Sequence, residues 1–481
     1  MRRAFSGRRF ETIVVAAYAA VLLVGIWHHE LWRDEIDSWL IARDSASPAE
    51  LLRNMHYEGH PALWHLLLLP LTRMFHDPVA MQAAQWLIAV TTAAVVMFCA
   101  PFDRATRVLV CFGYYFVFEY GVIARAYGLG ILLLLTAVVA SRRRSFVAAG
   151  FLLALAANTS IYALIIAAAL VIGLLVEQLL VTRSDHGRVA VAAVIASIGF
   201  IVAFAQIVRA MPPQASHRDI RQILQQFDHT SVRALQSGWL PIPNFSAAHV
   251  WNTELLTHRF FAAHANVIGG MLTLLFSALA VWAFRRRAAA LIVFATGTAM
   301  LGVFAAFYFN GTVRHHGHFF VLLILCSWVA GAVPRFLVPL LALHAALGGW
   351  FVCEDVRLRF APERAAADWL SEHGFADGPM AAIRASRGGP LSAFLPHRVY
   401  FLQMEKEGTF VSDPRGGIVL TPAEIADRVQ RWPARNPERI LISHYPLATT
   451  LANFRLEPLQ SFAENMADEE LYLYAVRGAS R

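Results

Sequence analysis

Two adjacent acids, Asp34 and Glu35, are the residues of this chain best suited to taking a proton from a substrate. They belong to a Trp-Arg-Asp-Glu motif at residues 32–35, which follows a long apolar segment. A carboxylate held near apolar surface gains affinity for a proton and can act as a general base. The alternative is an interfacial loop in which solvated acids lie among the tryptophans of a membrane-interface belt.

A second motif lies in the same polar loop. The sequence Tyr-Glu-Gly-His-Pro occupies residues 57–61 and adds Glu58 and His60 to the acid pair. The apolar stretch that follows, at residues 63–69, is too short to cross a bilayer and suits an interfacial helix. The two motifs together predict a site in the loop at residues 28–78, against a membrane surface.

The composition indicates a polytopic membrane protein. Of 481 residues, 57% are hydrophobic and 15% are charged, and the mean hydropathy is +0.50. Soluble domains average about 25% charged residues. The net charge of +8 comes mostly from short arginine clusters between apolar segments, which is typical of cytoplasmic loops and does not indicate nucleic-acid binding. The four cysteines lie in or beside apolar segments and form no disulfide framework.

The apolar segments predict about eleven transmembrane helices, at about 20 residues for each crossing. Residues 146–181 are too long for one crossing, and Asn-Thr-Ser at residues 158–160 is the expected turn. Basic clusters alternate with polar loops, so the positive-inside rule places the N-terminus in the cytoplasm and the segment after the last crossing outside. The clusters lie at residues 2–9, 104–107, 142–144, 183–188, 285–287 and 335, and the outer loops at residues 28–78, 119–125, 209–264 and 310–316.

The composition changes after residue 353. We expect residues 1–353 to form the transmembrane domain and residues 354–481 to form a soluble α/β domain on the outer side. Helices are expected from Glu363 to a C-cap at Gly374 and after a Thr-Pro-Ala-Glu capping box at residues 421–424. This domain has no nucleotide loop, metal-spaced Cys/His set or nucleophile elbow, so substrate docking and a structural role both stay open. Strands are expected at residues 379–383, 398–403, 439–443 and 470–476.

Three sequence boxes together resemble the GT-C glycosyltransferases, which are integral-membrane enzymes that use polyprenyl-phosphate sugars. The boxes are Trp-Arg-Asp-Glu-Ile-Asp-Ser-Trp at residues 32–39, Glu-Gly-His-Pro-Ala-Leu-Trp at residues 58–64 and Arg-Ala-Tyr at residues 125–127. They are similar to the branch that contains the protein O-mannosyltransferases and the lipid A aminoarabinose transferases, where an Asp-Glu pair precedes a His-Pro-Pro box. This chain reads His-Pro-Ala, so one proline is missing. The resemblance covers the first 130 residues and beyond them rests on topology.

The resemblance implies that Asp34 is the base on the acceptor hydroxyl and that Glu35 is its partner. The leaving group is then a lipid phosphate, which departs as an anion and needs cationic or hydrogen-bonding neighbours. Several residues near outer helix ends could bind this substrate. Besides Glu58 and His60 they are Glu119, Arg125 and Tyr127 near the fourth crossing, and Arg314, His315 and His318 before the tenth.

These candidates also have simpler explanations. Arg125 can be an interfacial arginine that reaches lipid headgroups, and the three histidines in residues 315–318 can belong to a solvated loop end. His315 and His318 share a face if their segment is helical, and with a first-loop acid they could hold a divalent metal ion. The sequence demonstrates no ligand set for such a metal. The loop at residues 209–264 is a candidate lid.

These observations predict an inverting glycosyltransferase of the bacterial inner membrane. Its donor is a polyprenyl-phosphate sugar, and its acceptor is a hydroxyl of a cell-envelope glycan, a lipid or a protein on the outer face. A single base and a direct displacement leave no covalent intermediate. The alternative is a transporter or flippase of lipid-linked sugars, a class marked by charges within crossings and by repeated halves. In this chain the acids lie in loops, and the sequence identifies neither the sugar nor the acceptor.

Overall fold

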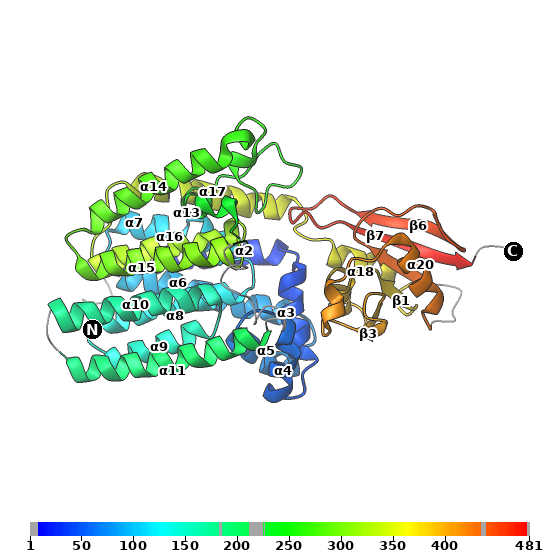
Figure 1. Ribbon diagram of the computed structural model, residues 1–481, viewed down its shortest axis with the longest axis horizontal. Helices are drawn as coiled ribbons and strands as arrows, with labels where there is room; N and C mark the ends of the chain where they lie inside the picture. Colours follow the sequence, from blue (N-terminus) through cyan, green and yellow to red (C-terminus); the bar gives the residue numbers. More distant parts are fainter. Residues whose placement is uncertain (1–7, 182–184, 211–224, 226, 434–438, 479–481) are drawn as a thin grey trace. The chain divides into compact units, whose positions relative to one another are not determined.

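The computed structural model of the chain describes residues 8–181, 185–210, 225, 227–433 and 439–478 (Figure 1). It divides into two compact units. The helical unit comprises Met1–Trp27, His60–Trp64 and Gln82–Glu354, and the α/β unit comprises His28–Gly59, His65–Met81 and Asp355–Arg481. The chain therefore passes into the α/β unit after Glu354, and most of the loop at residues 28–78 also belongs to that unit. The prediction, with one boundary at residues 353/354, placed this loop in the transmembrane domain instead.

The helical unit is built mainly from long apolar helices. Four of them, α8 to α11, run side by side (Figure 1). The helices are α2 (Arg9–His28), α6 (Val79–Cys99), α7 (Arg104–Cys111), α8 (Ala126–Arg142), α9 (Phe146–Ala157), α10 (Ile161–Leu175), α11 (His186–Ala210), α13 (Ala234–Trp239), α14 (Ala265–Phe284), α15 (Ala288–Phe307), α16 (Val313–Ala330) and α17 (Leu337–Arg357).

Eight helices within the described ranges are long and apolar enough to cross a membrane. They are α2, α6, α10 with its extension to Gln178, α11, α14, α15, α16 and α17. The multi-pass helical fold is confirmed. The other three of the eleven expected crossings correspond to shorter elements, namely α8, α9 and the pair formed by α7 and a π-helix at Tyr115–Glu119. At 1.5 Å per residue the 12-residue α9 spans about 18 Å, less than the hydrocarbon thickness of about 30 Å.

The break between α9 and α10 lies at the predicted turn. Asn158 ends α9, and the Ser160 hydroxyl accepts a hydrogen bond of 3.2 Å from the Ala163 N–H at the start of α10. The Asn158 side chain donates to the carbonyls of Ala154 and Gly199. The bonds at Ala154 and Ala163 satisfy backbone groups that the two helix ends would otherwise leave unpaired, and the bond to Gly199 connects the turn to α11.

Helix α16 is the most enclosed crossing, because it packs against α8, α10, α13, α14 and α15. The contact with α13 depends on Gly238, since a Cβ atom there would lie 2.1 Å from the His316 carbonyl oxygen. The N-terminal turn of α16 carries Arg314, His315 and His318. The histidine motif therefore lies inside the unit, where the alternative of a solvated loop end does not apply to His315 or His318.

The α/β unit contains a seven-stranded sheet with the order β3-β2-β1-β4-β7-β6-β5. Strand β1 pairs in parallel with β2 and β4, and the other pairs are antiparallel. Helix α18 (Glu363–Glu372) packs on one face and α20 (Pro422–Arg431) on the other. The strands are β1 (Met380–Ala382), β2 (Val399–Phe401), β3 (Lys406–Gly408), β4 (Arg439–Ser443), β5 (Thr450–Leu451), β6 (Phe454–Phe462) and β7 (Leu471–Gly478).

The expected helices and four expected strands of this region are confirmed. Gly374 follows His373, the C-cap of α18, and has a φ of +76°, the left-handed conformation that favours glycine just after a helix. Thr421 caps α20 reciprocally with Glu424. The sequence did not predict β3, β5 or β6. Strand β6 contains Pro458, which reads as a strand breaker, and the structure accommodates it at a register shift between Pro458 and Gln460.

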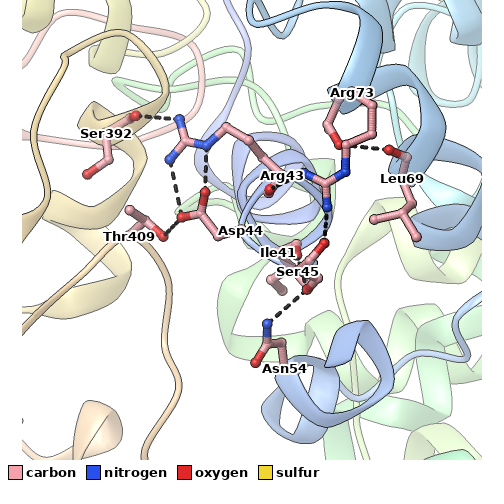
Figure 2. Close-up of polar contacts among 10 residues, drawn as sticks. Ile41, Arg43, Asp44, Ser45, Asn54, Leu69, Arg73, Ser392 and Thr409 are labelled. Carbon is pink, nitrogen blue, oxygen red and sulfur yellow. Dashed lines mark hydrogen bonds and ion pairs between the residues drawn. The ribbon is translucent and has the colours of Figure 1, made fainter. Parts of the chain in front are cut away.

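Three helices from the loop at residues 28–78 complete the α/β unit: α3 (Arg33–Arg43), α4 (Pro48–Asn54) and α5 (Leu63–Met74). The end of α3 is bound to the C-terminal part of the chain (Figure 2). Arg43 donates to Asp44 and, over 2.8 Å, to the Ser392 carbonyl, while the Thr409 hydroxyl donates to Asp44 over 2.6 Å. Arg73 of α5 donates to the carbonyls of Arg43 and Ser45. These bonds hold α3 within the unit.

Replacing Asp44 tests this attachment. Asp44→Ala leaves Thr409 and Arg43 without their shared acceptor, and we expect a loss of about 1–3 kcal/mol of stability. The measurement is the thermal unfolding midpoint of the purified protein, with exposed Arg53→Ala of the same segment as the control. An Asp44→Ala midpoint equal to that of the control would contradict the attachment.

Candidate functional site

Asp34 lies in the first turn of α3, which begins at Arg33. Its side chain is 24% exposed, and its Oδ1 lies 3.4 Å from Nε of Arg33. The N-terminus of a helix carries a partial positive charge, so a carboxylate is favourably placed there. Asp34 is therefore an acceptor at the surface of the α/β unit, held at a fixed helix end.

Glu35 has a different environment from Asp34, because its side chain is completely buried. Its Oε2 accepts a hydrogen bond of 2.9 Å from the Trp32 N–H and lies 3.1 Å from Nε2 of His29. The first contact satisfies a backbone donor at the start of α3. These contacts fix the start of the helix on which Asp34 stands. The predicted role of Glu35 as the catalytic partner of Asp34 stays a prediction.

His29 is the residue that sequence reasoning missed at this point. Its Nδ1 lies 2.9 Å from Oδ2 of Asp355, so the imidazole lies between two buried carboxylates. Burial lowers the pKa of His29, but the charges of Asp355 and Glu35 outweigh burial and raise the pKa to about 10. His29 is then an imidazolium that donates to both carboxylates. No sequence spacing links residue 29 to residue 355, so only folding shows this contact.

A second buried network lies beside Asp34. Arg33 Nε is 2.6 Å from Oε1 of Glu469, and Arg387 contacts the same oxygen at 2.9 Å. Burial and the neighbouring Glu469 charge raise the pKa of Glu363 well above its usual value. Arg387 and Glu469 thus hold the guanidinium of Arg33 next to Asp34.

Glu58 also belongs to the α/β unit. Its Oε1 lies 4.0 Å from Nε2 of buried His65, which is at the limit of an ion pair. Asp34, Glu35 and Glu58 are therefore in one compact unit, whereas the other seven predicted site residues belong to the helical unit. In the helical unit, five of the seven meet in one cluster of rings.

The ring cluster is centred on Tyr127, at the start of α8. The Tyr127 ring lies 5.2 Å from His318, 5.8 Å from His60 and 6.2 Å from His315, and the guanidinium of Arg125 lies 5.8 Å from its centroid. Predicted residues from three distant parts of the sequence therefore contact one tyrosine. This arrangement combines aromatic faces with a buried cation.

Two further tyrosines, absent from the predicted set, complete this cluster. Tyr162 stacks on His318 with centroids 4.4 Å apart and an interplanar angle of 18°. The Tyr120 hydroxyl donates to the Arg314 carbonyl over 2.5 Å and lies 3.3 Å from Nδ1 of His318. Tyr120 follows Glu119 directly, so its position beside predicted residues could have indicated it as a further site residue. Nothing in the sequence distinguishes Tyr162 in this way, because it is one aromatic residue in a long apolar helix.

Glu119 and Arg314 lie beside the cluster and contact one tryptophan. The Glu119 Oε2 accepts hydrogen bonds from the Tyr114 hydroxyl at 2.8 Å and from Nε1 of Trp251 at 3.0 Å. Arg314 lies 5.5 Å from the centroid of the Trp251 ring. Trp251 belongs to the loop at residues 209–264, so part of that loop packs on the site. Residues 211–224 and 226 of the candidate lid lie outside the described residues.

The histidine contacts bear on the candidate metal. His315 Nδ1 accepts from the Thr312 N–H at 3.0 Å, and His318 Nδ1 lies 3.0 Å from the His315 carbonyl, so each ring keeps only Nε2 for another ligand. In the ranges that the structure describes, no three His, Cys, Asp or Glu side chains group as a metal site. Two imidazole nitrogens alone do not complete the three- or four-ligand set of a catalytic or structural metal. Metal binding at His315 and His318 stays a prediction.

Membrane-length helices and an α/β unit that includes most of the first large loop define a polytopic membrane protein with two compact units. No protein-family model matches the chain, and no curated protein matches its sequence. A solved structure with this fold is that of ArnT from Cupriavidus metallidurans bound to undecaprenyl phosphate. The two chains are 14% identical, and the match covers 96% of this chain and 97% of that chain with a TM-score of 0.51. This similarity confirms the fold that the sequence boxes imply.

The buried histidine makes a prediction about pH. Because the folded-state pKa of His29 is raised from 6.5 to about 10, its contribution to stability is complete below the lower value and is lost as the pH rises through the higher one. We expect His29→Gln to cost about 3–5 kcal/mol at neutral pH, since two buried carboxylates lose their cation. Thermal unfolding midpoints between about pH 7 and pH 10 measure both effects.

The variant should also show a flatter decline of stability with rising pH than the original protein. His56→Gln, in the same unit, is the control and should keep the original profile. Parallel profiles for the original protein and His29→Gln would show that His29 is not held as an imidazolium.

Proposed function

We propose that this protein is a membrane glycosyltransferase that moves a sugar from a polyprenyl-phosphate donor to a hydroxyl acceptor. The observation that carries the proposal is a fixed, partly exposed Asp34 in a chain with the fold of ArnT. The ArnT in the solved structure is bound to undecaprenyl phosphate. That supports a lipid phosphate as the donor carrier in this chain.

In the proposed reaction Asp34 acts as the general base. The acceptor hydroxyl loses its proton to the Asp34 carboxylate while its oxygen attacks the anomeric carbon, and the bond from that carbon to the phosphate oxygen breaks. The electron pair of the broken bond leaves on the phosphate. One direct displacement inverts the anomeric centre. The buried contacts of Glu35 with His29 and the Trp32 N–H support a positioning role in holding Asp34 at the start of α3.

The departing phosphate needs positive charge and hydrogen-bond donors. The ring cluster supplies them in the helical unit, with Arg125 over Tyr127 and with the hydroxyl of Tyr127 and the Nε2 atoms of His315 and His318. We assign donor phosphate binding to this cluster, with Arg125 as the principal cation. Its aromatic faces suit the first isoprene units of the lipid, because they offer apolar contact beside the charge.

We place the reaction on the outer face of a bacterial inner membrane. Arginine clusters at residues 142–144 and 285–287 end helices α8 and α14, as expected for cytoplasmic ends. The start of α8, with Arg125 and Tyr127, is the opposite end of that helix and hence the outer one. A lipid-linked sugar is the natural donor there, because nucleotide sugars are cytoplasmic. The acceptor is a cell-envelope glycan, a lipid or a protein.

The base is tested by Asp34→Asn. The amide keeps the shape of the side chain and cannot take a proton, so we expect turnover to fall by about 10²- to 10⁴-fold with an unchanged unfolding midpoint. The assay uses purified protein with a polyprenyl-phosphate sugar and an extract of cell-envelope glycolipids. Asp37→Asn, one turn further along α3, is the control and should lose less than about tenfold. Full activity of Asp34→Asn would remove the assignment of the base.

The phosphate contact is tested by Arg125→Ala and Arg125→Lys. Loss of one charge-assisted contact should raise the KM for the polyprenyl-phosphate sugar by about tenfold or more in the alanine variant. Lysine keeps the charge without the planar fork, so we expect partial recovery. Steady-state kinetics with varied donor measure the change, and exposed Arg188→Ala is the control. An unchanged donor KM in both Arg125 variants would exclude this contact.

A further inference from the structure

A cavity of about 380 Å³ lies in the helical unit between α8, α9, α10 and α15. Its walls are apolar and include Ala137, Leu153, Leu170 and Val293. The volume falls in the range of about 300–1,000 Å³ that is typical of small-molecule sites. The cavity is separate from the ring cluster, because it lies at the opposite end of the same helices. Tyr127 begins α8, whereas Arg142, which lines the cavity, ends it.

Three arginines line the cavity at its polar end: Arg142, Arg144 and Arg287. Glu177 is the acid among the lining residues, so the lining carries a net charge of +2, of which Asp185 outside the lining compensates one. Arg142 donates to the Trp328 carbonyl over 2.8 Å, and Arg144 is paired with Asp185, which holds both side chains in place. Arg287 precedes α15 and is exposed.

The inner wall of the cavity is tightly packed. Helices α10 and α15 approach closely at Gly173, where an added Cβ atom would lie 2.2 Å from Cγ2 of Val293. Phe146, at the start of α9, and Leu153, two turns further along, are buried. The cavity is therefore a slot between packed helices, with apolar walls and a cationic mouth at the helix ends.

The position of the mouth indicates the kind of molecule that fits it. Arginines at the ends of apolar transmembrane helices lie at the level of the lipid headgroups, and the apolar walls continue from there into the hydrocarbon region. A molecule with an anionic head and an acyl chain matches both parts at once. Basic pockets between transmembrane helices bind anionic lipid headgroups for the same reason.

We propose that this cavity is a binding site for an anionic glycerophospholipid, separate from the donor and acceptor sites. The phosphate of the lipid contacts Arg144 and Arg287 at the mouth, and one acyl chain lies along Ala137, Leu153 and Leu170. The lipid stabilises the packing of α8, α9, α10 and α15. This inference does not depend on the proposed glycosyl transfer, because binding and stability are measured without turnover.

The test compares two pairs of substitutions within the same arginine clusters. Arg144→Gln with Arg287→Gln removes two cations that line the cavity, whereas Arg143→Gln with Arg285→Gln removes two that do not line it. Both pairs lower the net charge equally. The full chain, purified in detergent, is titrated with phosphatidylglycerol or with phosphatidylcholine, and the unfolding midpoint is followed. Because a ligand that binds only the folded state raises the midpoint, the shift reports binding.

We expect phosphatidylglycerol to raise the midpoint of the original protein and of the Arg143/Arg285 pair, and phosphatidylcholine to have a much smaller effect. The Arg144/Arg287 pair should bind phosphatidylglycerol at least about tenfold more weakly. Arg287→Gln alone, at an exposed position, gives the same comparison if the double variant does not fold. Equal weakening in both pairs, or equal stabilisation by the two lipids, would overturn the proposal.

Discussion

The candidate base depends on one buried cation, because His29 fixes the start of the helix that carries Asp34. Its imidazolium contacts Glu35 at 3.1 Å and Asp355 at 2.9 Å, and all three side chains are inaccessible to solvent. Buried charges are costly unless they are paired, so these groups stabilise one arrangement and disfavour others. Glu35 also accepts the Trp32 N–H and thus connects the ion pair to the backbone at α3. In a neighbouring network Arg33 and Arg387 both contact Glu469, and the network places the positive charge of Arg33 next to Asp34.

The helical unit uses a different principle, since its predicted site residues meet through rings more than through ion pairs. Tyr127, Tyr162 and His318 pack face to edge or stacked, and α16 can bring its histidines there because Gly238 lets α13 approach it closely. The packed rings hold one another in position, and the buried guanidinium of Arg125 lies against the ring of Tyr127. A site for a lipid phosphate needs this combination, because the ligand is itself both apolar and anionic.

Helices of the ring cluster also line the cavity, with their opposite ends. Helix α8 begins beside Arg125 and Tyr127 and ends at Arg142, which lines the cavity proposed to hold an anionic lipid. Nearly all residues between these ends are apolar. A bilayer favours transmembrane helices that have charged residues at each end and an apolar body between them. In this chain one end of α8 adjoins the ring cluster and the other adjoins the cavity.

The sequence by itself determined the membrane class, the position of most helices and four strands of the sheet, and it supplied the candidate site residues, because hydropathy, caps and short motifs are local signals. It also placed Asp34 and Glu35 together, but it could not distinguish them, since burial of Glu35 and exposure of Asp34 arise only when α3 packs. Tertiary structure alone decided the partners of His29, the place of Tyr162 and the strand β6 with its proline. These features depend on contacts between residues far apart in the chain, and no spacing in the sequence encodes such contacts.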